Sequence, residues 1–109
     1  MLPNFERAIV EPSKVRDYLL SPAHPVGRFK AVVFAALGYT QDHWELLQID
    51  LLTMGASNPA VLGQVSPYGQ KFEVSGILVG PSGRSGTFVS VWLVPTGDEI
   101  PRLVTVFPG

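Results

Sequence analysis

The 109-residue sequence contains no cysteine. This absence excludes disulfides, cysteine-ligated zinc and thiol chemistry. A chain of this length buries roughly 60–68% of the surface that its unfolded form exposes, so it can fold without a metal or a disulfide. We therefore expect one domain, residues 1–109, with no metal and no cofactor.

Charge and long apolar runs are also scarce. Charged residues make up 16% of the chain, and the formal net charge is −1, so binding of nucleic acid would need a local cluster of cations. No stretch approaches the ~20 apolar residues of a membrane span, and the amino terminus lacks a basic segment followed by an apolar run. We expect a soluble, cytoplasmic protein that makes no membrane contact.

Apolar residues are abundant, at 46% of the chain, and their spacing changes near Asn58. Before Asn58 they recur at helical spacing, and after it they alternate or form short β-branched blocks between Gly and Pro. The segment 80–86, "GPSGRSG", is typical of a hairpin turn between two strands. The pattern predicts an α+β fold in which amino-terminal helices pack on one face of a three- to four-stranded antiparallel sheet.

Three helices are expected in the first half of the chain, each with its own apolar stripe. The first is short and follows a candidate cap at Ser13. The second begins near Pro25 or Gly27 and ends at Gly38. The residues of this helix that are expected to face the core are Val26, Phe29, Val33, Ala36 and Leu37. The third covers roughly 41–54, ends at Gly55, and carries at matching spacing Trp44, Leu47, Leu51 and Met54. In the second half, Trp92 is expected in the core.

Several familiar catalytic patterns are missing. The glycines of 80–86 lack the Lys-Ser/Thr pair of a phosphate-binding loop, no serine lies in a Gly-x-Ser-x-Gly turn, and His24 and His43 lack metal-ligand spacing. The residue types that remain suit metal-independent cleavage of RNA, which needs an acid, a base and cations near phosphorus. These candidates are His24, Lys30, Tyr68, Lys71, Arg84 and Arg102.

We expect His24 to act as general base or acid, Lys30 and Arg102 to stabilise charge on the phosphate, and Tyr68 to stack on the substrate or donate to it. Each candidate also has a purely structural interpretation. His24 would cap a helix, Lys30 would run its stem along the core, and Arg102 would protect a sheet edge. Lys71 would pair with Glu73, and Arg84 would be solvated.

The segments "HPVGRFKAVVF", "YGQKF" and "PRLVTVFPG" resemble a family of uncharacterised bacterial domains, found alone and as the carboxy-terminal tips of polymorphic toxins. The resemblance implies the barnase-like, EndoU-like and colicin-type ribonuclease fold, in which helices precede a four-stranded antiparallel sheet. It also adds Thr105, with Tyr68 and Lys71, to the expected substrate-binding residues. The motif positions present are His24, Lys30, Tyr68, Lys71, Trp92, Arg102 and Thr105.

Two functional hypotheses follow. The first is a metal-independent endoribonuclease that acts on RNA as the toxin half of a two-gene module. The second is a non-enzymatic interaction module of the same fold, which binds an antitoxin-type protein or a second copy of itself through its sheet face or an exposed strand edge. The mean hydropathy of +0.24 is high for a small domain and predicts a homo-oligomer or a surface covered by a partner.

Overall fold

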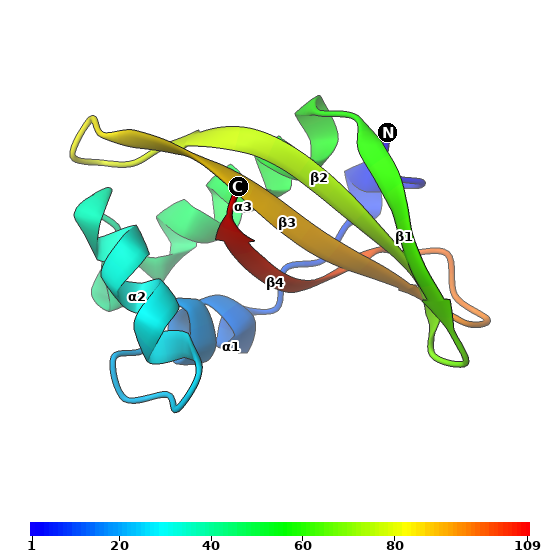
Figure 1. Ribbon diagram of the computed structural model, residues 1–109, viewed down its shortest axis with the longest axis horizontal. Helices are drawn as coiled ribbons and strands as arrows, with labels where there is room; N and C mark the ends of the chain where they lie inside the picture. Colours follow the sequence, from blue (N-terminus) through cyan, green and yellow to red (C-terminus); the bar gives the residue numbers. More distant parts are fainter.

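The computed structural model describes residues 1–109, and its helices all precede its strands (Figure 1). Helical segments occupy the first half of the chain, and they are η1 (Phe5–Arg7), α1 (Pro12–Lys14), η2 (Val15–Leu19), α2 (Gly27–Ala36), η3 (Gln41–His43) and α3 (Trp44–Ser57). The strands are β1 (Ala60–Ser66), β2 (Gly69–Val79), β3 (Ser85–Pro95) and β4 (Arg102–Pro108).

The four strands form one antiparallel sheet in the order β1-β2-β3-β4. The long strands β2 and β3 pair without a break from Gly69↔Pro95 to Val79↔Ser85. The residues between them form the turn expected at 80–86. The α+β prediction and the antiparallel hairpin are therefore confirmed.

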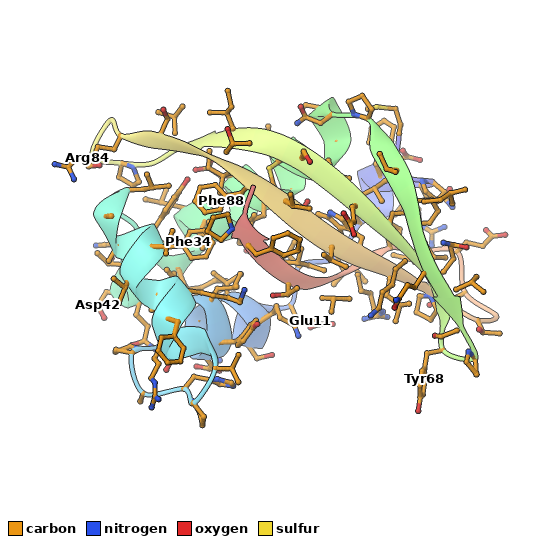
Figure 2. The ribbon with its side chains drawn as sticks, in the orientation of Figure 1. Glu11, Phe34, Asp42, Tyr68, Arg84 and Phe88 are labelled. Carbon is orange, nitrogen blue, oxygen red and sulfur yellow. The ribbon has the colours of Figure 1, made fainter.

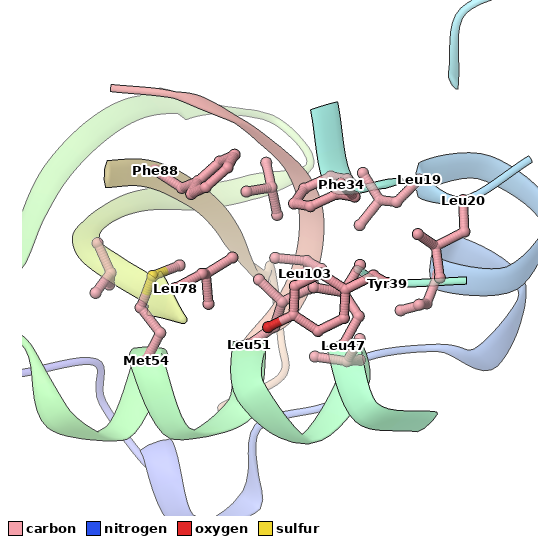
Figure 3. Packing of buried hydrophobic residues seen from close by; sticks show 14 of the residues in the cluster. Leu19, Leu20, Phe34, Tyr39, Leu47, Leu51, Met54, Leu78, Phe88 and Leu103 are labelled. Atoms are coloured by element: carbon pink, nitrogen blue, oxygen red, sulfur yellow. The ribbon is translucent and has the colours of Figure 1, made fainter. Parts of the chain in front are cut away.

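The core lies between the sheet and the helices. α3 runs behind the sheet, whereas α1 and α2 lie beside β4, so the other sheet face carries no helix (Figure 1). Trp92 is fully buried, as expected, and its indole N–H donates to Ser90 Oγ at 2.8 Å. Leu47, Leu51 and Met54 of α3 reach the same cluster (Figure 3), which confirms their predicted positions.

The apolar face of α2 differs from the prediction. Phe34 is buried and stacks on Phe88 of β3, with ring centroids 5.3 Å apart (Figure 2). Of the five residues expected in the core, Leu37 is buried and Val33 is half-buried. Val26 and Phe29 are 57% and 66% exposed, and Ala36 is exposed as well. Two overlapping apolar stripes fit the sequence of this helix, and packing against β3 selects the one that contains Phe34.

The helix boundaries agree with the prediction at the end of α2 and differ at α1 and α3. Ser13 does not cap the first helix, because α1 begins at Pro12 after Glu11. Gly38 follows α2 with a φ of +95°, a left-handed conformation that favours glycine at a helix end. Gly55 does not end α3, which continues to Ser57. A side chain at Gly55 would lie 2.8 Å from the Trp92 ring, so this glycine makes room for the indole. None of the helices has the length and apolar content to cross a membrane.

Candidate functional site

The start of α2 is held against the wide turn η2. Leu20 N–H donates to Val15 O at 2.9 Å, a bond across five residues that marks the rare π geometry often found near functional sites. Gly27 touches this turn so closely that an added Cβ would lie 1.8 Å from Tyr18 O. The absence of a side chain at Gly27 therefore brings the loop before α2 beside Tyr18.

His24 lies in that loop with its ring fixed on two sides. Its Nδ1 accepts hydrogen bonds from the backbone N–H groups of Val26, at 3.0 Å, and Gly27, at 2.9 Å. The Tyr18 ring packs edge-on against the imidazole, with centroids 5.1 Å apart. The capping interpretation of His24 is therefore correct for Nδ1, while Nε2 makes no hydrogen bond within the protein.

The neighbouring strand β4 contributes Thr105. The sheet register shifts between Val91 and Trp92, so that Leu103 pairs with Trp92 and Thr105 with Val91, and Val104 is the extra residue. A bulge of this kind changes the face to which the following side chains point. Here the bulge leaves Val106 in the core and puts Thr105 on the opposite face of the sheet. The Oγ1 atom of Thr105 lies 3.0 Å from the Tyr18 hydroxyl.

Lys30 and Lys14 supply positive charge to the same region. Lys30 Nζ donates to Val106 O at 2.8 Å, which holds the ammonium at the edge of β4. Lys14 Nζ lies 5.3 Å from the centroid of the Tyr18 ring. Neither lysine belongs to the two ion pairs of the molecule, which join Arg16 to Asp17 and Arg102 to Glu11.

Together these side chains line an open cleft of about 850 Å³ between η2, the start of α2 and β4. The lining residues are Ser13, Lys14, Asp17, Tyr18, His24, Val26, Lys30, Val104 and Thr105. Asp17 is the only carboxylate among them, and the hydrogen bonds from Arg16 hold its pKa below the ordinary value. The cleft therefore combines one imidazole, three hydroxyls, one carboxylate that is held by Arg16, and two lysines that belong to no ion pair.

Other predicted site residues lie outside this cleft. Arg102 is at the start of β4, where its guanidinium pairs with Glu11 at 3.0 Å. Lys71 lies in the same row of the sheet, since both residues pair with Leu93, and two strand spacings of about 4.8 Å separate them. Tyr68 is 79% exposed in the β1–β2 turn, at the opposite end of the long axis from α2 (Figure 2).

The structure thus brings together His24, Lys30 and Thr105, but not Arg102, Tyr68 or Lys71. It adds Lys14 and Tyr18, which the sequence analysis did not single out. The spacing of four residues between Lys14 and Tyr18 places both on one side of a helical turn. This spacing could have identified Lys14 and Tyr18 as neighbours. It does not indicate which strand they face.

The fold and the cleft define the class: a small α+β protein with an open, basic recess beside the last strand of its sheet. A family model described as a domain of unknown function (DUF6883) matches residues 1–109, and the chain belongs to this family. Among curated proteins there is no match.

Among solved structures, the chain is similar to one chain of a "Contact-dependent growth inhibition toxin - immunity protein complex from Klebsiella pneumoniae 342". The identity is 22%, the TM-score is 0.73, and the match covers 94% of this chain and 100% of that chain. At this identity, the likeness establishes a shared fold.

Proposed function

We propose that this chain is a toxin-like endoribonuclease that cleaves RNA without a metal ion, using the cleft between η2, α2 and β4. The observation that carries the proposal is the convergence of His24, Lys30, Thr105, Tyr18 and Lys14 from three elements on one recess. The similarity to a chain from a toxin–immunity complex supports the toxin-like class, and the resemblance to toxin-tip domains supports RNA as the substrate.

In the proposed reaction, the ribose 2′-oxygen loses its proton and attacks the adjacent phosphorus, and the bond to the 5′-oxygen breaks. The products are a 2′,3′-cyclic phosphate and a 5′-hydroxyl, which gains a proton. Negative charge develops on the phosphate oxygens, where cations and hydrogen-bond donors lower the barrier. Lys14 and Lys30 supply the charge. The Tyr18 and Thr105 hydroxyls share one hydrogen bond, so the pair supplies one further donor.

The test incubates the folded protein with mixed RNA in the presence of a chelator. We expect fragments that end in a 2′,3′-cyclic phosphate. The Lys14→Met variant should cleave at least about tenfold more slowly, since removal of one transition-state contact commonly costs that much or more. Arg84→Met, at the exposed β2–β3 turn, is the matched control and should cleave like the wild type. Failure of the folded wild type to cleave RNA would overturn the proposal.

A second candidate function is supported by the outer surface of α2. Phe29 and Val32 of α2 are 66% and 71% exposed, and together with Ala31 and Ala35 they line a second, apolar hollow on this helix. This apolar patch favours an interaction module whose partner is an antitoxin-type protein or a second copy of the chain. The partner in the matched complex supports the same idea.

Light scattering tests the homodimer. Under this hypothesis, the wild type is a dimer and Phe29→Glu is a folded monomer. A wild type that stays monomeric at high concentration would exclude the second copy as the partner.

A further inference from the structure

The two ring nitrogens of His24 have different surroundings, and the difference limits what this residue can do. Backbone N–H groups are always donors, so Nδ1, which receives two of them at 3.0 and 2.9 Å, must be the unprotonated nitrogen. In the neutral ring the single proton is then on Nε2. The Tyr18 ring, edge-on at 5.1 Å, holds the imidazole plane in this orientation.

A neutral imidazole in this tautomer has a hydrogen-bond donor at Nε2 and no lone pair there. It cannot accept a proton at Nε2, and a proton added at Nδ1 would displace the amide hydrogen bonds of Val26 and Gly27. The general base or acid role that the sequence suggested for His24 is therefore disfavoured by its own contacts. The same contacts occupy these two amide groups at the start of α2, so they are not available to bind an anion.

We propose that His24 is a fixed, neutral hydrogen-bond donor that binds a phosphate oxygen of the RNA backbone through Nε2–H. The proposal rests on the ribonuclease function proposed above and names the chemistry of its phosphate site. Lys14 and Lys30 face the same cleft without carboxylate partners, so an oxyanion beside Nε2 would meet both a directed donor and positive charge.

Proton transfer then belongs to the other titratable groups that face the cleft. The Asp17 carboxylate, which Arg16 holds through two hydrogen bonds, is the group that can accept the 2′-hydroxyl proton. The Tyr18 phenol and the Lys14 and Lys30 ammonium groups are the ones that can donate a proton to the 5′-oxygen. His24 instead contributes electrostatic stabilisation from a preorganised position, which needs no rearrangement during the reaction.

The tautomer can be measured without any substrate. A two-bond ¹⁵N–¹H correlation spectrum of labelled protein at about pH 7.5, above the ordinary imidazole pKa, should show His24 with Nε2 protonated and Nδ1 bare. His43 is the internal control, because its ring is exposed and makes no hydrogen bond within the protein, and it should show both tautomers in exchange. A proton on Nδ1 of His24 would overturn the proposal.

Addition of inorganic phosphate tests the binding role directly. We expect it to shift the Nε2–H signal of His24, with a smaller response in Lys14→Met, and to leave His43 unchanged. Equal shifts for His24 and His43 would indicate a general salt effect and would contradict the site.

Three variants separate the structural role from the phosphate contact. His24→Asn keeps an oxygen that can accept hydrogen bonds from the backbone N–H groups, but it lacks a donor at the position of Nε2–H. His24→Gln has a longer side chain whose N–H can reach that position. His24→Ala has neither the acceptor nor the donor. We expect His24→Asn to melt close to the wild-type temperature yet cleave RNA about 100-fold more slowly, the cost of one lost donor. His24→Gln should retain more activity than His24→Asn or His24→Ala.

The pH profile distinguishes donation from proton transfer. If His24 only donates a hydrogen bond, His24→Gln lowers the rate by the same factor at every pH above the ordinary imidazole pKa. A change in the shape of the profile of His24→Gln within that range would overturn the proposal. A folded wild type that does not cleave RNA would overturn the ribonuclease function, and the ¹⁵N spectrum and the phosphate titration would then decide the donor assignment on their own.

Discussion

Tyr39 is 2% exposed, and its hydroxyl donates to a carboxylate oxygen of Asp50 on α3. The ring lies among core leucines from several elements (Figure 3). Burial of the phenol and the neighbouring Asp50 carboxylate both raise the pKa of Tyr39, because each disfavours the phenolate. The residue links the segment after α2 to α3 through one partly buried hydrogen bond.

Replacement of Tyr39 by Phe removes this hydrogen bond and should lower the free energy of unfolding by about 1.5–3 kcal/mol, the range for bonds to charged groups. The raised pKa of Tyr39 also gives a pH dependence. Its contribution is fully present below the ordinary phenol pKa of about 10 and is lost as the pH rises above that value. As the pH rises above about 10, the melting temperature should therefore fall more steeply for the wild type than for Tyr39→Phe. Parallel curves would contradict the assignment.

At the scale of single elements, α2 exposes one phenylalanine and buries another, five positions apart. The Arg28 guanidinium lies 4.8 Å from the centroid of the exposed Phe29 ring. Phe34 instead contacts Phe88 and Tyr39 in the core. The two residues have the same chemistry and differ in their packing.

This pair supports a direct comparison of stability by denaturant unfolding. Phe34→Ala should lower the free energy of unfolding by about 3–5 kcal/mol, as truncations of buried aromatic residues do. Phe29→Ala should change it by less than about 1 kcal/mol, since only an exposed cation–π contact is lost. Similar losses in the two variants would show that Phe29 contributes to the core.

The same helix shows how far periodicity could predict the fold. Alternation and turn residues were sufficient for the β2–β3 hairpin, because a strand pair depends on local signals. The stripe of α2 was ambiguous, because apolar residues occur on more than one side of this helix. Sequence spacing does not identify the side that faces β3; contact with Phe88 does.

The candidate site was predictable from the sequence only where its residues are close together in the chain. His24 and Lys30 lie near one helix start, so a local pattern could suggest them together. Tyr18 joins them only because Gly27 allows η2 to approach α2, and Thr105 faces them only because of the bulge at Val104. These contacts depend on tertiary packing and sheet register, which no local sequence pattern records.

The whole molecule is 37 Å long, and the helices α1 and α2 lie towards one end of it, whereas the β1–β2 turn lies at the other (Figure 1). The net charge of −1 gives no general attraction for RNA. Attraction must therefore come from the local group formed by Lys14 and Lys30, whose charges no carboxylate neutralises. Binding of RNA at the cleft should consequently depend on few phosphate contacts and be sensitive to each lysine.

The dependence of RNA affinity on salt measures these contacts. For single strands, the slope of log affinity against log salt falls by about 0.7 for each phosphate contact. Lys14→Gln and Lys30→Gln should each reduce the magnitude of the slope by about this amount, with thermal melts to verify the fold, because Lys30 also bonds to Val106 O. Arg84→Gln, at the β2–β3 turn beside the carboxyl end of α2, removes the same charge outside the cleft and should leave the slope unchanged. If all three variants reduced it equally, RNA would be attracted by the total charge of the protein and not by the cleft.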